Sequence, residues 1–297
     1  MTRISTNEAY QTITDQIVAG METAQGNWKA GWARLGLPVN ASGVPYNGLN
    51  IIVLFMSAST HGYNYNEWGT YNAWKKRGAC VKAGEKATTR VLKWVNVPRR
   101  DENGEKTDKT FLVPRAYPVF NIDQVKGAEP RSVPVKNDVE AIEHCEEYIN
   151  ATLADIRLGG DSAHYTPAKD EIAMPHMYSF RSAQAFYATC FHELIHWSGS
   201  DKRLDRLKVG AKSTRTDYAY EELIAELGSA FLCSDHGVVE DDARQDHIEY
   251  ISSWIKLLKS DPKAIFNASR EARKAKEFLD KTVQETLKEA GLDKRAA

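Results

Sequence analysis

The sequence predicts an α+β protein with two domains, an N-terminal mixed α+β domain over residues 1–130 and a C-terminal domain over residues 137–297. Its length of 297 residues is more than one domain usually needs. A loop-like stretch with Gly and Pro, residues 127–134, lies near the middle. The charge changes there too, because residues 1–130 carry 16 Lys and Arg against 11 Asp and Glu, whereas the rest carries 23 against 29.

The N-terminal domain begins with an amphipathic segment. Ile13, Ile17 and Met21 recur every four residues, which predicts a helix over residues 1–24. Aromatic and basic residues then crowd together: five of the seven Trp precede position 130, and residues 75–100 hold nine Lys and Arg against one acid. Such a mixture suits single-stranded nucleic acid, since bases stack on rings while cations follow the phosphates. An ordinary core with a solvated basic rim explains the same composition.

The C-terminal domain opens with a helix predicted over residues 137–154. Residues 170–174 alternate between polar and apolar side chains like a short strand, and the run stops at Pro175. Because proline lacks the N–H that an inner strand donates, we expect this run to form the edge of a sheet that covers the following helix.

That following helix carries the most informative motif, His192-Glu193-Leu194-Ile195-His196, which fits the pattern H-E-x-x-H. The segment 182–197 contains no Gly or Pro, Ser182 can cap its start and Gly199 can end it. Positions four apart share one helical face, so both histidines can bind one metal ion while Glu193 takes a proton from a metal-bound water. Two ordinary histidines in a core helix are the alternative, but burying them without a partner is costly, which favours a metal.

A second apolar helix, predicted over residues 218–232, supplies candidate third ligands. Glu222 and Glu226 lie four residues apart and share one face, so one can bind the metal while the other accepts the ring N–H of a ligand histidine. Glu221 is interpreted as a solvated acid at the helix start. Residues 200–217, rich in charge, are expected to form an ordinary connecting loop, with a mobile flap over the site as the alternative.

Several runs resemble the ArdC family of plasmid antirestriction proteins. The N-terminal domain of that family, which is also fused to some plasmid primases, is matched by Tyr46-Asn-Gly-Leu-Asn50, Trp68-Gly-Thr-Tyr-Asn-Ala-Trp-Lys-Lys76, Val81-Lys-Ala-Gly-Glu-Lys-Ala-Thr88 and Val119-Phe-Asn-Ile-Asp-Gln124. The family's C-terminal metallopeptidase-like domain is matched by Met174-Pro175, the H-E-x-x-H run and Tyr220-Glu-Glu-Leu-Ile-Ala-Glu-Leu227. An H-E-x-x-H helix followed by a Glu-bearing helix also resembles the Glu-type zincin metallopeptidases.

The resemblance implies a single-stranded-DNA-binding domain joined to a zincin-like metallopeptidase domain, and a role in protecting an entering conjugative plasmid from host restriction. It implies a zinc ion held by His192, His196 and Glu222, with Glu193 as catalytic base and Glu226 behind a ligand histidine. The long segment between the motifs leaves the choice between Glu222 and Glu226 open. Imidazole and carboxylate ligands also accept Mn²⁺ or Co²⁺. Zincins commonly lay a substrate along an edge strand, the role implied for residues 170–174.

For DNA, the candidates are aromatic residues that could stack on bases and basic residues that could contact phosphates. They are Tyr46, Trp68, Tyr71 and Trp74 for stacking, some of which are expected to be core, and Lys75, Lys76, Arg77, Lys82, Lys86 and Arg90 for the phosphates. The absence of a long apolar run predicts a cytoplasmic protein without a membrane partner. Two hypotheses remain: a DNA-targeted protease that cuts proteins met on DNA, such as restriction enzymes, and a DNA-coating protein whose zincin domain is structural or catalytically silent.

Overall fold

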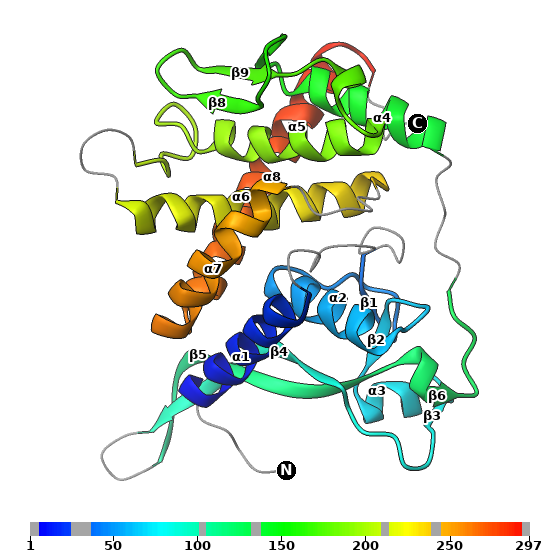
Figure 1. The fold of residues 1–297 in the computed structure, drawn as a ribbon. Helices are drawn as coiled ribbons and strands as arrows, with labels where there is room; N and C mark the ends of the chain where they lie inside the picture. Colours follow the sequence, from blue (N-terminus) through cyan, green and yellow to red (C-terminus); the bar gives the residue numbers. More distant parts are fainter. Residues whose placement is uncertain are drawn as a thin grey trace. The chain divides into compact units, whose positions relative to one another are not determined.

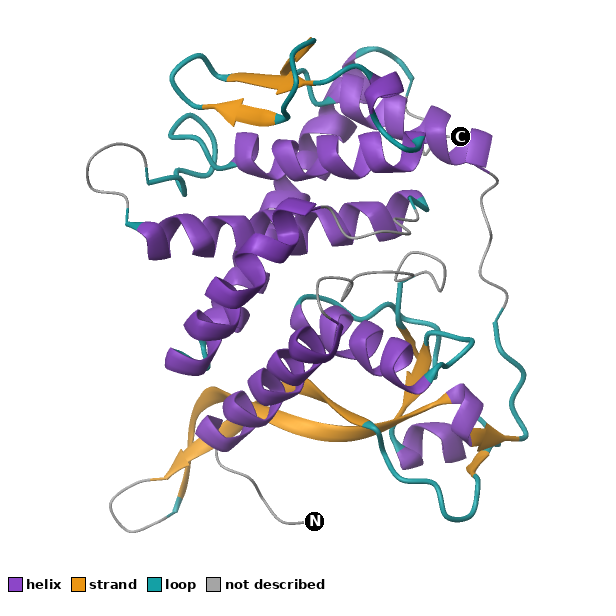
Figure 2. Cartoon of the chain, viewed as in Figure 1, coloured by secondary structure: helices purple, strands orange, loops and turns teal. Residues whose placement is uncertain are grey.

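The computed structural model describes residues 6–24, 37–100, 105–131, 138–208, 214–238 and 245–292 (Figures 1 and 2). The chain divides into two compact units, one made by Met1–Thr23 with Pro38–Arg131 and the other containing Ser132–Ala297. Each unit contains both helices and strands. The prediction of an α+β protein with two domains is therefore confirmed. Among the described residues, no helix combines the length and the apolar character needed to cross a membrane.

The N-terminal unit is built on a sheet with the strand order β1-β2-β5-β4. These strands are β1 (Val39–Asn40), β2 (Glu67–Gly69), β4 (Thr89–Arg100) and β5 (Lys106–Asn121). The two long strands pair antiparallel along most of their length and form a hairpin (Figure 2). A smaller sheet pairs β3 (Cys80–Val81) with β6 (Val125–Lys126), which follows the 3₁₀ turn η2 (Ile122–Gln124).

Within the residues that the structure describes, three α-helices complete this unit: α1 (Thr6–Ala24), α2 (Leu49–His61) and α3 (Tyr71–Lys76). The four-residue pattern of α1 is confirmed, because Ile13, Ile17 and Met21 are all buried. Helix α2 is apolar almost all round, so it lies inside the unit, and it ends where Gly62 adopts a left-handed conformation with φ 64°.

The outer edge of β4 is partly covered by a side chain. The amide of Asn50, on α2, donates to the carbonyl of Leu92 at 2.9 Å and accepts from the N–H of Leu92 at 2.8 Å. Asn50 thus takes the place of a neighbouring strand at that position, which satisfies backbone groups that an edge strand otherwise leaves unpaired.

In the C-terminal unit, helix α4 (Asp138–Ala151) precedes a sheet with the order β7-β9-β8. Strand β9 (Glu171–Met174) pairs parallel with β7 (Asp155–Leu158) and antiparallel with β8 (His164–Thr166). The prediction of an edge strand over residues 170–174 is therefore wrong. Pro175 follows the strand and removes no N–H from its ladders, so the proline marked the end of a central strand.

The remaining helices of this unit are α5 (Ala183–Ser198), α6 (Arg215–His236), α7 (Gln245–Ser260) and α8 (Ala264–Glu289). The hydroxyl of Ser182 accepts from the N–H of Ala185 at 3.1 Å and Gly199 is the C-cap of α5, as predicted. Between α5 and α6, a Cβ on Gly228 would lie 2.6 Å from Cδ1 of Ile195. Glycine at this position therefore lets the two helices approach closely, which brings side chains of α6 to the histidines of α5.

Candidate functional site

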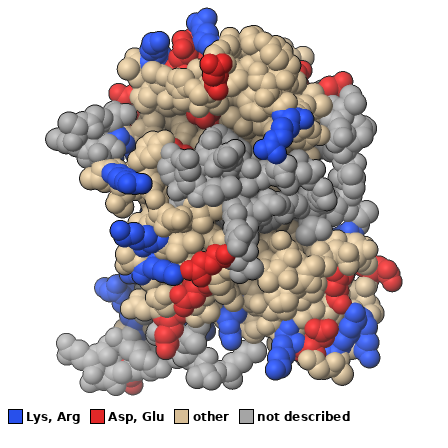
Figure 3. Space-filling model, viewed as in Figure 1, with Lys and Arg blue, Asp and Glu red and all other residues tan. Residues whose placement is uncertain are grey.

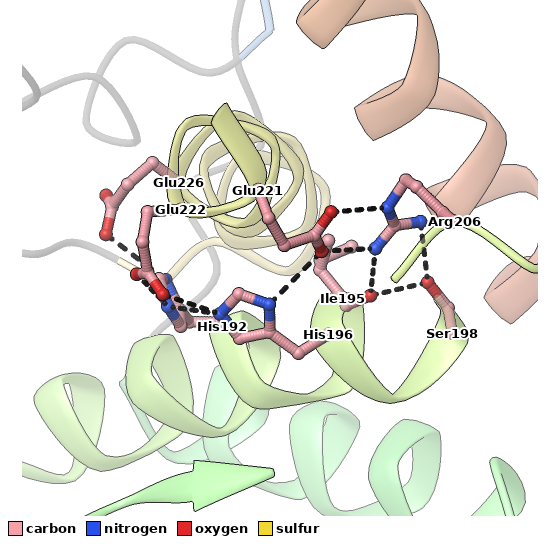
Figure 4. A network of polar contacts seen from close by, with 8 residues as sticks. All are labelled: His192, Ile195, His196, Ser198, Arg206, Glu221, Glu222 and Glu226. Atoms are coloured by element: carbon pink, nitrogen blue, oxygen red, sulfur yellow. Dashed lines mark hydrogen bonds and ion pairs between the residues drawn. The ribbon is translucent and has the colours of Figure 1, made fainter. Parts of the chain in front are cut away.

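Three side chains from α5 and α6 converge on one point (Figure 4). The Nε2 atoms of His192 and His196 are 3.1 Å apart, and the carboxylate of Glu222 lies 3.4 Å from the first and 3.5 Å from the second. Ligands bonded to zinc at about 2.0–2.1 Å in a tetrahedron lie about 3.3 Å from one another. The spacing of the three side chains therefore fits a single metal ion with one position left open.

Each histidine has a carboxylate on its other nitrogen. Nδ1 of His196 lies 3.2 Å from Oε1 of Glu221, in hydrogen-bonding geometry. Nδ1 of His192 lies 3.1 Å from Oε1 of Glu226, within ion-pair distance but outside hydrogen-bonding geometry. Protons held at both Nδ1 atoms leave two lone pairs on Nε2 facing each other, an arrangement that a cation between them stabilises. The two outer carboxylates thus favour metal binding through Nε2.

The interpretation of Glu221 as a solvated acid is wrong. It is largely buried, and its carboxylate accepts two hydrogen bonds from Arg206, at 2.9 Å from Nε and 2.8 Å from Nη2 (Figure 4). Arg206 lies 15 residues earlier in the chain, in a segment without regular structure. Helical periodicity carries no information about a partner that arrives from a turn, so the sequence pattern gave no signal for this contact.

For Glu221 and Glu222, two of the three acids beside the histidines, the contacts favour the charged form. Burial by itself would raise the pKa of Glu222, but the contacts with His192 and His196 outweigh burial and lower it. Burial likewise opposes ionisation of Glu221, and the contacts with His196 and Arg206 lower its pKa. These contacts therefore favour the carboxylate form, which a metal ligand and a partner of an imidazole N–H both require.

Glu193 directly follows His192 in α5 but is not one of the three converging side chains. Its side chain is 4% exposed, and among the described residues its carboxylate has no hydrogen-bond or ion-pair partner. A buried carboxylate without a fixed partner is available for the proton-accepting role that the sequence predicts for Glu193.

The turn after α5 is firmly held, which disfavours a mobile flap over residues 200–208; residues 209–213 lie outside the described part. Arg203 stacks on Trp197, with its guanidinium carbon 3.9 Å from the ring centroid, and donates to the carbonyl of Trp197 at 2.6 Å. It also binds both carboxylate oxygens of Asp170, just before β9. The turn thus connects α5 to the small sheet.

Two of the four aromatic stacking candidates lie inside the N-terminal unit. Trp68 and Trp74 are 0% exposed, and their ring N–H groups donate to Asn66 at 2.7 Å and to the carbonyl of Phe120 at 3.1 Å. Neither offers a ring face to a base, so both are corrected to core residues. Tyr46 is half-buried, and burial raises its pKa to about 12. Only Tyr71, at 53% exposure, presents most of its ring.

The basic candidates divide in the same way. Arg77 forms an ion pair with Glu67 and donates to the carbonyl of Glu129, and Lys82 donates to the carbonyl of Asp123 at 2.7 Å. Both are held by the fold. The remaining candidates are exposed and have no side-chain partner within the described residues; they are Lys75, Lys76, Lys86 and Arg90. On the face drawn in Figure 3, basic and acidic side chains are interleaved and do not gather in one patch.

The long hairpin carries an exposed aromatic residue that the sequence interpretation did not select. Trp94, on β4, is 53% exposed and pairs with Pro114, while Leu112, diagonally across from it, is 59% exposed. On the other face of the hairpin, Lys93 lies directly opposite Arg115. Like charges in such a pair repel, and an anion between them relieves the repulsion. Knowing that Trp94 faces outward requires the register of the hairpin. Trp28 and Trp32 lie outside the described residues.

Comparisons with known proteins match both halves of the chain. Residues 7–120 match the family model described as the N-terminal domain of anti-restriction factor ArdC, and residues 143–271 match a model described as zincin-like metallopeptidase. The uncharacterized protein y4eC of Sinorhizobium fredii is 36% identical over 92% of this chain and 91% of its own. A DNA primase TraC of Escherichia coli is 33% identical over 94% of this chain, which spans 27% of that primase.

Two crystal structures of the antirestriction protein ArdC from plasmid R388 are similar along nearly the whole chain. The metal-free structure has a TM-score of 0.76 and 35% identity, covering 93% of this chain and 98% of that one. The Mn(II)-bound structure has a TM-score of 0.73 and 34% identity, covering 92% and 97%.

Proposed function

Because the chain belongs to the ArdC family of plasmid antirestriction proteins, we propose that it protects entering plasmid DNA in the cytoplasm through two activities. The N-terminal unit holds single-stranded DNA. The C-terminal unit is a metal-dependent peptidase that acts on proteins met on that DNA, such as restriction enzymes. The convergence of His192, His196 and Glu222 within metal-ligand distance carries this proposal.

The resident ion in this proposal is divalent. Two imidazole nitrogens and one carboxylate are the ligand set of many catalytic zinc sites, and the same set accepts Mn²⁺ or Co²⁺. The Mn(II)-bound relative supports a divalent ion, and we propose zinc for this chain. A bound ion of this kind supplies a Lewis acid that acidifies a coordinated water and polarises a peptide carbonyl.

The chain's own residues supply the proton transfers and the orientation. Glu193 accepts the proton of the attacking water and later donates it to the nitrogen of the leaving amine. Glu221 and Glu226 hold protons at Nδ1 of His196 and His192, which keeps both Nε2 atoms directed at the ligand position. Residues 170–174 form the central strand of their sheet and so cannot align a substrate along an edge. We assign that role to β8, which lies at an edge of the same sheet and contacts α5, so that an extended peptide can align along it.

Replacing Glu193 by Gln tests the peptidase half of the proposal. Glutamine has nearly the same shape but cannot accept the proton, so the Glu193→Gln protein should retain its metal and lose peptide cleavage. Metal content is measured by elemental analysis, and cleavage is measured on proteins bound to single-stranded DNA. DNA binding of the same variant is the control and should not change. A variant that cleaves at the wild-type rate removes Glu193 from the mechanism.

The burial of the site favours a second hypothesis, a DNA-coating protein whose zincin domain is structural or silent. His192, Glu193 and Glu222 are 5%, 4% and 8% exposed, which leaves little of the site open to a protein chain. Plasmid transfer into a restricting host separates the two hypotheses. Protection that is lost with Glu193→Gln supports proteolysis, whereas protection that persists supports the DNA-coating role.

A further inference from the structure

One arginine connects three parts of the C-terminal unit. The side chain of Arg206 is 8% exposed, and its guanidinium binds both carboxylate oxygens of Glu221 on α6. The same group donates to the carbonyl of Ile195 at 2.7 Å and lies 3.5 Å from the hydroxyl of Ser198. These last two acceptors belong to the final turn of α5, whose carbonyl groups have no partner further along the helix.

The local sequence is arranged so that Arg206 can enter this position. The N–H groups of Arg206 and Leu207 donate to the carbonyl of Gly199 at 2.8 and 2.9 Å, which folds the turn back against the end of α5. A Cβ on Gly199 would lie 2.7 Å from Nη2 of Arg206 and 3.0 Å from its Cζ. Glycine here therefore does more than end the helix, because it leaves the space in which the guanidinium lies.

Glu221 in turn contacts a predicted metal ligand. The oxygen that accepts from Nη2 of Arg206, Oε1, is the one that lies 3.2 Å from Nδ1 of His196. A carboxylate fixed on one side by a two-pronged guanidinium has little freedom to rotate. It therefore holds the imidazole of His196 in one orientation, with the proton on Nδ1 and the lone pair of Nε2 directed at the ligand position (Figure 4).

We propose that Arg206 is a positioning residue for the metal centre: through Glu221 it fixes the tautomer and ring orientation of His196, so that metal affinity depends on the turn of residues 199–207. This inference rests on the metal site of the proposed function. It assigns to the turn between α5 and α6 a role at the metal centre.

The same turn offers a matched control. Arg203 is also buried, at 11% side-chain exposure against 8% for Arg206, and it also binds a carboxylate, that of Asp170. It contacts Trp197 and Tyr165 but neither Glu221 nor a histidine of the site. Methionine in place of either arginine keeps an apolar stem of similar length and removes the charge. Comparing the two variants separates a loosened turn from a lost contact to His196.

The test titrates Zn²⁺, against a competing chelator, into the full-length apo forms of wild type, Arg206→Met, Arg203→Met, Glu221→Gln and the double variant Arg206→Met/Glu221→Gln. Loss of a partner behind a ligand histidine typically weakens metal binding about 10- to 100-fold, and we expect that loss for Arg206→Met and Glu221→Gln. Arg203→Met should bind Zn²⁺ like wild type. Because both residues act through the same hydrogen bond, the double variant should bind no more weakly than the weaker single variant.

A second measurement reports on His196 directly. Imidazole ¹⁵N spectra of the apo protein should show one tautomer for His196 in wild type and in Arg203→Met, and a mixture in Arg206→Met. Arg206→Lys, which keeps the charge without the planar fork, should recover part of the affinity. If Arg206→Met unfolds, Glu221→Gln carries the same test. The inference is overturned if Arg203→Met weakens binding as much as Arg206→Met, if the effects of the double variant add, or if the tautomer does not change. A wild-type protein that binds no Zn²⁺ or Mn²⁺ contradicts the proposed metal site itself.

Discussion

At the scale of single residues, Glu222 and Glu226 lie one helical turn apart yet contact different nitrogens of the same histidine. Glu222 is 3.4 Å from Nε2 of His192, whereas Glu226 is 3.1 Å from Nδ1. Only the first position also reaches Nε2 of His196, at 3.5 Å. The two acids therefore occupy different positions: one faces the point between the two Nε2 atoms, and the other faces the back of an imidazole.

This difference predicts a ranking of metal affinities. Glu222→Ala should weaken metal binding about as severely as His196→Ala, because each removes one of three bonds to the ion. Glu226→Ala should cost less, about 10- to 100-fold. Titration of metal into each apo variant gives the order. If Glu226→Ala is the worse variant, the two roles are exchanged, and if neither change matters, the third ligand lies elsewhere.

A second residue-scale prediction concerns acid stability. The hydrogen bonds from Arg203 hold the pKa of Asp170 well below its usual range, despite an opposing effect of burial. A depressed folded-state pKa stabilises the protein above the unfolded-state pKa of about 3.9, and the contribution is lost as the pH falls through the folded-state pKa. Asp170→Asn should therefore lower the melting temperature at neutral pH, and its deficit against wild type should shrink once the pH falls below about 4.

Asparagine is a suitable replacement because residue 170 has φ 57°, a left-handed conformation that Asn tolerates, so the backbone is preserved. Differential scanning calorimetry of both proteins between neutral and acidic pH makes the comparison. A deficit that stays constant as the pH falls would assign the effect to something other than this ion pair.

The residues of the candidate metal site could be selected from the sequence because their information is local. The four-residue spacing of His192 and His196 and the apolar pattern around them depend on one helix, and both helices formed where expected. Glu221 was misinterpreted because its burial depends on Arg206, a partner outside the helix. A helical pattern tells which face a residue shares but not which distant side chain covers it.

At the scale of elements, strand order was less accessible than helix position. The alternation over residues 170–174 indicated a strand correctly, but whether that strand is central depends on β7 and β8, whose own sequences are short and weakly patterned. The hairpin of β4 and β5 was not predicted, since its register is set by pairing across the chain. Consequently the outward face that carries Trp94 was not identified either.

The spacing of α5 and α6 leads to a prediction at this scale. Gly228→Ala would place a Cβ 2.6 Å from Cδ1 and 2.7 Å from Cγ1 of Ile195, so the helices must separate. Overpacking of this kind costs about 1–3 kcal/mol in stability, and the shift also carries Glu222 away from the histidines. We expect a lower melting temperature and weaker metal binding. Ile195→Ala in the same chain removes the clashing atoms and should recover part of the metal affinity; no recovery would contradict the packing explanation.

At the scale of the whole molecule, many residues that carry the N-terminal family resemblance maintain the fold. Trp68 and Trp74 are core, Thr70 caps α3, and Asn121 with Gln124 forms the capping box of η2. A motif of this sort identifies the domain without locating its ligand. The proposed DNA-binding surface must therefore be sought among exposed side chains, which carry little sequence signal.

The different exposure of Trp94 and Trp74 predicts that replacing them has different effects. Trp94→Ala should weaken binding of the full-length protein to single-stranded DNA, because stacking of one base on an aromatic ring is worth about 1–3 kcal/mol, while its melting temperature stays close to that of wild type. Trp74→Ala should lower the melting temperature, because it removes a ring that is wholly inside the unit. At temperatures where this variant remains folded, its affinity for single-stranded DNA should stay close to that of wild type. Fluorescence anisotropy with a labelled oligonucleotide and thermal unfolding measure the two effects.

Salt dependence then identifies the phosphate contacts. Each phosphate neutralised on a single strand contributes about 0.7 to the slope of log affinity against log salt. If Lys93 and Arg115 hold one phosphate between them, Lys93→Gln and Arg115→Gln should each flatten that slope, whereas Lys82→Gln, whose ammonium is bound to the carbonyl of Asp123, should leave it nearly unchanged. Equal affinity for single and double strands would contradict base stacking. An unchanged affinity in Trp94→Ala, with wild-type binding intact, would move the DNA surface from the hairpin to the exposed Tyr71 and the lysines beside it.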